Sequence, residues 1–222
     1  MLPLRIAGLG RFVAGMAWRA AARPSTAVAM WRISAAVTLP ASLPGEIEAW
    51  FARRGWRPRQ HQLDMLAEAD AHRHALLVAD TGAGKTLAGF LPTLADFPRS
   101  RLGSAPVPEG LHTLYVSPLK ALAHDVQRNL MTPIAEIGLP IRVETRSGDT
   151  PSDRKARQRA RPPHVLLTTP ESLSLLLSYP ESAQLFATLR RVVIDEMHAF
   201  ASGKRGGLLA LCLARLQALA PD

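Results

Sequence analysis

The stretch HALLVADTGAGKTLAGFLP, residues 74–92, decides the fold. A short apolar run leads into a glycine-rich turn, and GKT then begins a segment that favours a helix. Backbone N–H groups of such a turn can surround phosphate oxygens, and the N-terminus of the following helix favours anions. The stretch therefore predicts a phosphate-binding loop after a strand. Ala79 stands where the usual pattern has its first glycine, which is tolerable because only a left-handed backbone or a close approach demands glycine.

The loop residues have predicted roles in binding ATP with Mg²⁺. Backbone groups of Thr81, Gly82 and Gly84 would surround the phosphate oxygens. Lys85 would reach the β- and γ-phosphates, which also makes it a catalytic candidate, and the Thr86 hydroxyl would bind Mg²⁺.

RRVVIDEMH, residues 190–198, predicts a second half of the same site. An apolar strand ends in Asp195 and Glu196, and carboxylates in an apolar setting are costly without a cation. Asp195 is expected to hold Mg²⁺, and Glu196 to orient or deprotonate the attacking water. The alternative is that the two acids have a purely structural role. The phosphate loop in the same chain argues against this alternative. His198 lacks the companions of a zinc ligand, and its grouping with the two acids makes it a catalytic candidate.

The regular part of the chain is predicted to begin at residue 43 with two helices, one over about 43–55 and one from about residue 58. Strands and helices are then predicted to alternate to the end. The expected strands span residues 74–79, 111–117, 141–147, 164–169 and 190–196. They are continuous apolar runs, which suit a parallel sheet covered on both faces. The pattern predicts an α/β fold with three layers and a mainly parallel sheet. Ligands of such sheets bind at the carboxyl ends of the strands, where both motifs lie.

Composition indicates a globular chain with one core. It has 222 residues, of which 47% are hydrophobic and 20% charged, and no apolar run is long enough for a membrane helix. The single cysteine, Cys212, excludes an internal disulfide and is interpreted as a small core residue. A net charge of +9 suits a polyanionic partner without demanding one.

Residues 1–42 are predicted to be an extension outside the domain, which spans 43–222. The start is rich in Ala and Arg and holds no acid. Three interpretations stay open: an extension or wrongly assigned start, with Met30 as an alternative initiator; a targeting segment; and an ordered accessory element.

ADTGAGKT together with DEMH resembles motifs I and II of the superfamily-two DExH-box helicases. FARRGWRPRQHQ (51–62) resembles their Q motif, in which Gln62 would read the adenine edge. SPLKALAHD (117–125) resembles motif Ia and TTPESL (168–173) motif Ib, while RSGDT (146–150) lies where a further nucleic-acid-binding motif is expected. The resemblance implies contacts with nucleic acid from Ser117, Pro118, Lys120, Arg146, Gly148, Asp149, Thr169 and Pro170.

The sequence is more specifically similar to the ligase-associated DEXH-box helicases, the Lhr-Core group of bacterial DNA repair. GLHTLYVSPLKALA, PPHVLLTTPESLSLLLS and SGKRGGLLALCLARL carry this similarity, which runs from about residue 43 to the end. It implies the first RecA-like lobe of a phosphate-loop helicase that uses ATP and Mg²⁺. It further implies 3′-to-5′ movement on single-stranded DNA, unwinding of DNA or RNA–DNA duplexes, a bacterial cytoplasmic, nucleoid-associated location and association with a repair ligase or nuclease.

The resemblance also implies a second lobe, and we expect the chain to be a C-terminally truncated first lobe that hydrolyses almost no ATP alone. A truncated, non-hydrolysing nucleotide- or nucleic-acid-binding module is the alternative. A different phosphate-loop enzyme, such as a nucleotide kinase, would lack Gln62, SPLKAL, TTPE and the acidic motif. Two residue-level alternatives stay open: RKARQRAR (154–161) contacts DNA or is a solvated face, and Trp56 stacks on adenine or pins the flanking helix.

Overall fold

A computed structural model describes residues 29–32, 43–80, 82–118, 120–201 and 203–219. No helix within these ranges is long and apolar enough to cross a membrane. Contacts divide the chain into two units. The sheet unit comprises Pro108–Gln127 and the chain from Arg142 onward, and the phosphate-loop unit comprises Arg23–Val107 and Arg128–Ile141.

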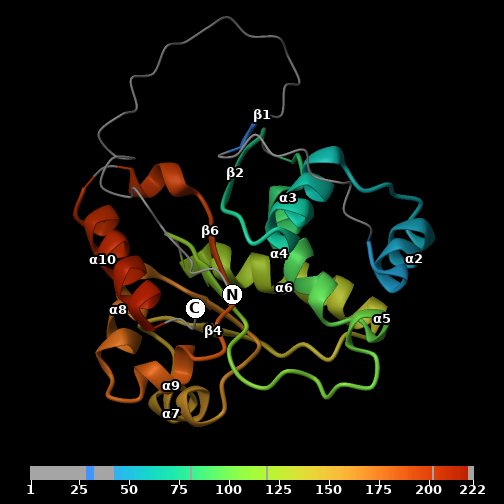
Figure 1. Ribbon diagram of the computed structural model, residues 1–222. Helices are drawn as coiled ribbons and strands as arrows, with labels where there is room; N and C mark the ends of the chain where they lie inside the picture. Colours follow the sequence, from blue (N-terminus) through green and yellow to red (C-terminus); the bar gives the residue numbers. More distant parts are fainter. Residues whose placement is uncertain (1–28, 33–42, 81, 119, 202, 220–222) are drawn as a thin grey trace, which may run out of the picture. The chain divides into compact units, whose positions relative to one another are not determined.

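Parallel strands form the centre of the sheet unit (Figure 1). Among the described residues they are β3 (Thr113–Val116), β4 (Val143–Arg146), β5 (Val165–Thr168) and β6 (Arg191–Ile194), in the order β4-β5-β3-β6. Every residue of β3 and β5 is buried. Because successive side chains of a strand point to opposite faces, both faces of these strands are covered, as the continuous apolar runs predicted.

Helices follow the strands of the sheet unit. They are α7 (Ser152–Ala160), α8 (Pro170–Ser178), α9 (Ser182–Phe186), the 3₁₀ turn η1 (Met197–Phe200) and α10 (Lys204–Leu219). Leu114 and Leu166 of the sheet share one buried cluster with Leu173 of α8 and Leu209 of α10. Cys212 belongs to the same cluster, which confirms its interpretation as a core residue.

The phosphate-loop unit is mainly helical. It holds β1 (Ala29–Arg32), α2 (Gly45–Arg53), α3 (Gln60–Asp70), β2 (Ala75–Val78), α4 (Lys85–Asp96) and α5 (Arg99–Leu102). Helix α6 (Lys120–Ile137) begins in the sheet unit and ends in this one. It continues seven residues beyond the expected end near Leu130.

The partner of β2 differs from the sequence prediction. We expected the strand of residues 74–79 in the parallel sheet. Within the described residues, β2 pairs with β1 in an antiparallel register, with Ala29 opposite Val78. The side chain of Val78 is 52% exposed, unlike the buried residues of β3 and β5. Strand β1 also lies inside the segment 1–42 that was predicted to be an extension.

Helix α2 is fastened within the phosphate-loop unit by aromatic and charged contacts. The indole of Trp50 donates to Glu136 Oε2 at 2.7 Å, and Arg54 pairs with the same carboxylate. Trp50 and Phe51 are each 3% exposed. Trp56 meets the Trp50 ring edge-on with 5.8 Å between centroids, so the structure favours the interpretation that Trp56 pins this helix.

Candidate functional sites

The glycine-rich turn forms a loop between β2 and α4. Gly82 and Gly84 have left-handed backbones, with φ of 80° and 77°. Gly84 is the N-cap residue of α4, and the Lys85 ammonium donates to the carbonyls of Ala79 at 2.7 Å and Asp80 at 3.0 Å. Ala79 itself has no positive φ, which is why alanine is acceptable there. Thr81 lies outside the described residues.

Residues at the start of α3 donate hydrogen bonds to the carbonyl groups of this loop. The Arg59 backbone N–H donates to Gln62 Oε1 at 2.9 Å, and Gln62 Nε2 donates to the Gly84 carbonyl at 3.5 Å. Arg59 Nη1 also donates to the Gly82 carbonyl at 3.3 Å. Gln62 is 4% exposed. In this state Gln62 therefore holds the loop, and its predicted contact with adenine stays a prediction.

The acidic pair follows the end of β6 in the sheet unit. The Asp195 N–H donates to the Val116 carbonyl at 3.0 Å, and Asp195 Oδ1 accepts from the Glu196 N–H at 2.9 Å. The Tyr115 hydroxyl donates to Asp195 Oδ2. Tyr115 is 1% exposed, and burial, with the Asp195 carboxylate beside it, raises the pKa of its hydroxyl.

The chemistry of these groups fits Mg²⁺ held jointly by protein and nucleotide. Thr86 lies in the first turn of α4, and Asp195 offers a half-buried carboxylate. Hydroxyl and carboxylate oxygens are the ligands that Mg²⁺ takes, usually one or two from the protein with phosphate oxygens and waters for the rest. No group of three or more His, Cys, Asp and Glu residues able to hold a metal ion occurs in the part of the chain that the structure describes.

Glu196 and His198 project from the turn after β6. Glu196 has a left-handed backbone, with φ 50° and ψ 44°, and is the N-cap residue of η1. His198 Nδ1 lies 3.2 Å from Glu196 Oε2, and the His198 side chain is 81% exposed. At this exposure the contact contributes little stability. Both side chains are accessible, as catalytic candidates must be.

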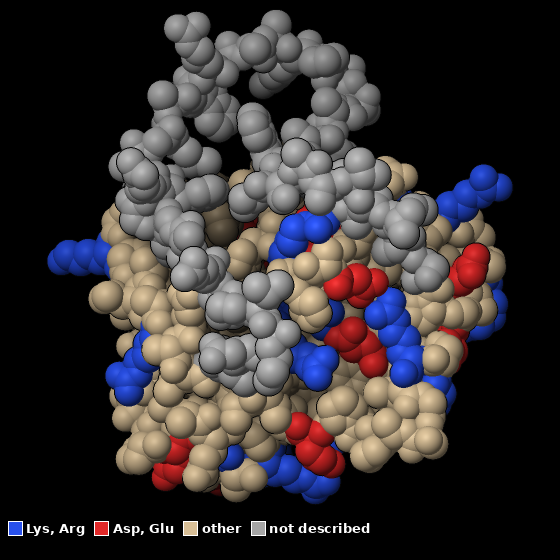
Figure 2. Space-filling view, viewed as in Figure 1, with Lys and Arg blue, Asp and Glu red and all other residues tan. Residues whose placement is uncertain are grey.

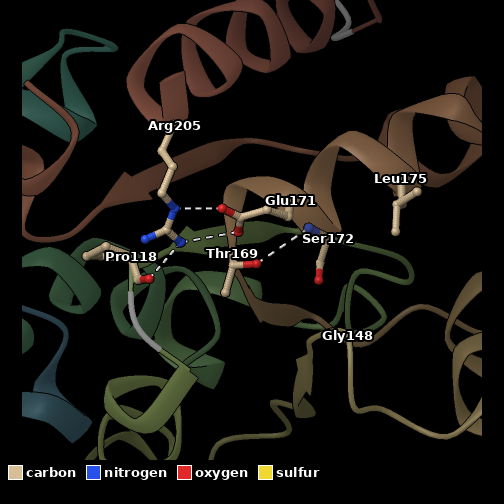
Figure 3. Close-up of a pocket in the computed structure, with 7 residues that line it drawn as sticks. All are labelled: Pro118, Gly148, Thr169, Glu171, Ser172, Leu175 and Arg205. Carbon is tan, nitrogen blue, oxygen red and sulfur yellow. Dashed lines mark hydrogen bonds and ion pairs between the residues drawn. The ribbon is translucent and has the colours of Figure 1, made fainter. Parts of the chain in front are cut away.

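A pocket of about 560 Å³ opens at the carboxyl ends of the strands in the sheet unit (Figure 3). Its lining consists of Pro118, Gly148, Thr169, Glu171, Ser172, Leu175 and Arg205. Three of these, Pro118, Gly148 and Thr169, are predicted nucleic-acid contacts. They come from three segments, after β3, β4 and β5, and only the tertiary fold brings them together.

Arg205 is a pocket residue that sequence reasoning missed. Its guanidinium donates to both carboxylate oxygens of Glu171, at 2.6 and 3.2 Å, and to the Pro118 carbonyl at 2.8 Å (Figure 3). The bond from Arg205 lowers the pKa of Glu171. No local sequence pattern singles out Arg205, because its partners lie 34 and 87 residues away in the chain.

Three other predicted nucleic-acid contacts do not line this pocket, and their side chains are buried. Ser117 is 0% exposed, and its hydroxyl has no hydrogen-bond partner among the described residues. Pro170 is buried at the first position of α8, where proline suits a helix start. Arg146 is 2% exposed, and burial lowers the pKa of its guanidinium. These side chains are turned into the fold and have structural roles there, and their contacts with nucleic acid stay predictions.

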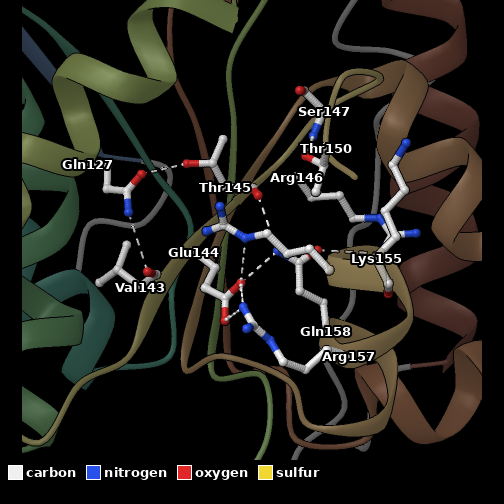
Figure 4. A network of polar contacts seen from close by, with 11 residues as sticks. Gln127, Val143, Glu144, Thr145, Arg146, Ser147, Thr150, Lys155, Arg157 and Gln158 are labelled. Carbon is white, nitrogen blue, oxygen red and sulfur yellow. Dashed lines mark hydrogen bonds and ion pairs between the residues drawn. The ribbon is translucent and has the colours of Figure 1, made fainter. Parts of the chain in front are cut away.

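Arg146 belongs to a network that holds α7 against β4 (Figure 4). It donates to the Lys155 carbonyl at 2.9 Å and to Gln158 Oε1 at 3.5 Å. The Lys155 ammonium donates in turn to the Gly148 carbonyl at 2.8 Å. The network therefore fixes the loop that presents Gly148 to the pocket. Asp149 in that loop is exposed.

Two arginines of α7 share one carboxylate within the unit. Glu144 accepts from Arg154 at 3.1 Å. It also accepts from Arg157 at 3.1 and 3.3 Å (Figure 4). Arg159 lies over the Tyr179 ring, with 4.3 Å from its guanidinium carbon to the ring centroid. On the face in Figure 2, acidic side chains likewise lie among basic ones. These contacts hold one side of α7, and the two interpretations of residues 154–161, a DNA contact or a solvated face, both stay open. For Lys120, only its place at the start of α6 is described.

The chain contains a phosphate loop, an acidic pair at a strand end and a pocket at the carboxyl edge of a parallel sheet. These features define a nucleotide-binding α/β domain of the helicase type. Residues 59–222 match the family described as DEAD/DEAH box helicase. The chain belongs to that family.

Similar proteins agree with this assignment. The chain is 37% identical over 185 residues to the ATP-dependent helicase Lhr-Core of Methanothermobacter thermautotrophicus, covering 79% of this chain and 21% of the relative. It is 44% identical over 183 residues to the Lhr helicase/probable uracil glycosylase of Mycolicibacterium smegmatis, covering 77% and 12%. The structure of Mycobacterium smegmatis helicase Lhr bound to ssDNA and AMP-PNP superposes with a TM-score of 0.71 at 41% identity, covering 81% of this chain and 23% of that one.

These similarities confirm the predicted resemblance to the Lhr-Core helicases and the predicted RecA-like fold class. The chain spans about a fifth or less of the length of the two curated relatives.

Proposed function

We propose that this chain is the ATP-binding lobe of an ATP-dependent DNA helicase or translocase. The observation that carries the proposal is the phosphate loop, in which left-handed glycines precede α4 and Lys85 lies against the strand-end carbonyls. A bound phosphate would take over the Lys85 ammonium and the free N–H groups at the start of α4. Family membership supports coupling of this nucleotide site to work on nucleic acid.

The nucleic-acid side of the proposal uses the pocket lined by Pro118, Gly148, Thr169 and Arg205. Backbone groups, a helix start and an arginine can hold phosphates without reading sequence. The solved M. smegmatis Lhr holds ssDNA and AMP-PNP, which supports single-stranded DNA as the ligand and ATP as the nucleotide. Mg²⁺ bound by Thr86 and Asp195 completes the proposed site.

The finer features of the proposal come from the Lhr-Core resemblance. They are 3′-to-5′ movement on single-stranded DNA, unwinding of DNA or RNA–DNA duplexes and a role in DNA repair with a ligase or nuclease. A bacterial cytoplasmic, nucleoid-associated location belongs to the same proposal. Strand displacement on duplexes with either a 3′ or a 5′ tail, with a DNA or RNA displaced strand, tests polarity and substrate. Faster unwinding of 5′-tailed duplexes would contradict the polarity.

Substitution of the nucleotide-site residues tests the proposal in the full-length protein. Lys85→Ala should abolish ATP binding and DNA-stimulated hydrolysis, because it removes the cation that faces the phosphates. Glu196→Gln should retain ATP binding and abolish hydrolysis, because the amide is a poor base for the attacking water. Glu181→Gln, which changes an exposed carboxylate at the start of α9, is the matched control and should hydrolyse ATP normally. DNA-stimulated phosphate release and fluorescent-nucleotide titration measure the two effects.

Two results would change the assignment. Retained turnover in Glu196→Gln would remove the water-positioning role from that residue. Nucleotide and DNA binding without DNA-stimulated hydrolysis in the unsubstituted protein would favour the alternative, a non-hydrolysing binding module.

A further inference from the structure

We propose that Tyr115 is a positioning residue that orients the Asp195 carboxylate toward Mg²⁺. Sequence motifs do not point to Tyr115, since it lies inside an apolar strand. The inference rests on the proposed function, in which Asp195 holds the cation of the bound nucleotide.

The strand register places the tyrosine beside this carboxylate. Strands β3 and β6 are parallel neighbours, and Tyr115 pairs with Val193. Asp195 lies two residues beyond Val193, and alternate residues of a strand share one face. The pairing continues past the end of β6, because the Asp195 N–H donates to the Val116 carbonyl at 3.0 Å. Tyr115 and Asp195 therefore lie on the same face, and the long phenol side chain reaches the carboxylate.

Both carboxylate oxygens of Asp195 have donors that fix its rotation. The Glu196 N–H donates to Oδ1 at 2.9 Å, and the Tyr115 hydroxyl donates to Oδ2. An ionised carboxylate offers about four lone-pair sites, so acceptor capacity is left on each oxygen for a cation. The donors thus set the direction of the remaining lone pairs before any metal arrives.

Burial makes the tyrosine a rigid donor. Tyr115 is 1% exposed, and all four residues of β3 are buried. A ring enclosed by packing cannot turn away, whereas Asp195 itself is half-buried and would otherwise rotate. Hydrogen bonds to metal-binding carboxylates typically change metal affinity by about 10–100-fold when removed. Tyr115→Phe removes the donor and keeps the ring, so it separates positioning from core packing.

The experiment is a Mg²⁺ titration in the full-length protein. Binding of a fluorescent ATP analogue is followed as Mg²⁺ is added, and binding without metal is measured in EDTA. Tyr115→Phe should raise the Mg²⁺ concentration at half-maximal binding by about tenfold and leave binding in EDTA unchanged. Saturating Mg²⁺ should restore kcat for hydrolysis, which a purely structural defect would not allow. Tyr179→Phe is the matched control, since it removes a hydroxyl from the tyrosine beside Arg159, and its Mg²⁺ midpoint should not move.

Asp195→Asn distinguishes failure of this inference from failure of the proposed function. If Asp195→Asn shifts the midpoint and Tyr115→Phe does not, the positioning role is wrong and the proposed function stands. If Asp195→Asn leaves the midpoint unchanged, Asp195 is not the metal ligand and the metal assignment fails with the inference. Circular dichroism checks folding of each variant. Should Tyr115→Phe not fold, 3,5-difluorotyrosine at position 115 supplies a stronger donor in the same packing. It should lower the midpoint, and an unchanged or raised midpoint would overturn the proposal.

Discussion

Two glycines of the phosphate loop share a backbone conformation and differ in their surroundings. Both Gly82 and Gly84 have positive φ, so any side chain at either position is strained. A Cβ on Gly82 would meet nothing within 4 Å, whereas one on Gly84 would lie 3.0 Å from Gln62 Nε2. The requirement for glycine is therefore conformational at position 82, and conformational and steric at position 84.

This difference predicts unequal effects of alanine in the loop. Gly82→Ala and Gly84→Ala should each lower the free energy of unfolding by about 1–2 kcal/mol, because both force alanine into the left-handed region. Gly84→Ala should lose about 1 kcal/mol more, because it displaces the Gln62 amide from the Gly84 carbonyl. Urea denaturation with and without Gln62→Ala forms a double-mutant cycle. If the two glycine variants still differ by the same amount in the Gln62→Ala background, the steric explanation is wrong.

At the scale of elements, one arginine connects the first turn of α8 with the start of α10 and with the chain after β3. Arg205 reaches Glu171 and the Pro118 carbonyl, which lies 87 residues earlier in the sequence. Such a paired arginine in a pocket can either hold the neighbouring helices together or bind a phosphate group of a ligand. The two roles differ in their salt dependence, because only a phosphate contact releases counterions.

We expect Arg205→Ala to weaken binding of single-stranded DNA and to reduce the magnitude of its salt slope by about 1. Arg205→Lys should keep part of the affinity, since it retains the charge and loses the planar fork. Arg215→Ala, which removes an exposed arginine from the same helix, is the control and should keep the slope. Fluorescence anisotropy at several salt concentrations measures both. Weaker binding with an unchanged slope would show that Arg205 only fastens the helices.

The elements were largely predictable because apolar runs and helical segments alternate clearly. The position of the site at the strand ends was predictable as well, since the phosphate loop and Asp195 each come directly after an apolar run. What local pattern cannot give is which side of a strand end faces the pocket. Ser117 and Pro118 are both buried, yet only Pro118 lines the pocket, and that difference is set by packing against segments far along the chain. The antiparallel partner of β2 was unpredictable for the same reason.

At the scale of the whole molecule, a buried histidine links stability to pH. His164 is 1% exposed, and its Nδ1 accepts from the Arg142 N–H at 3.0 Å. Burial, with the nearby Arg142 charge, lowers the pKa of His164 from 6.5 to about 4. Below pH 6.5 the unfolded chain binds a proton here that the folded chain does not. Stability from this group is therefore complete above pH 6.5 and is lost as the pH falls toward 4.

We expect the free energy of unfolding to fall by up to about 3 kcal/mol across this window because of His164. His164→Asn, whose side-chain oxygen can accept from the Arg142 N–H, should flatten the dependence. Urea denaturation at pH 7.5, 6.0 and 5.0 measures the difference between the two proteins. An equal loss of stability in both between pH 7.5 and 5.0 would exclude His164 as its source.

The left-handed backbone of Glu196 sets stability against activity. A non-glycine residue in this region costs about 1–2 kcal/mol, and glycine would relieve the strain. Directed evolution for heat resistance alone should therefore enrich glycine at position 196 and discard the carboxylate. Selection for ATP turnover should restore glutamate. The residue found at position 196 would thus show whether a population of variants was selected for stability or for ATP turnover.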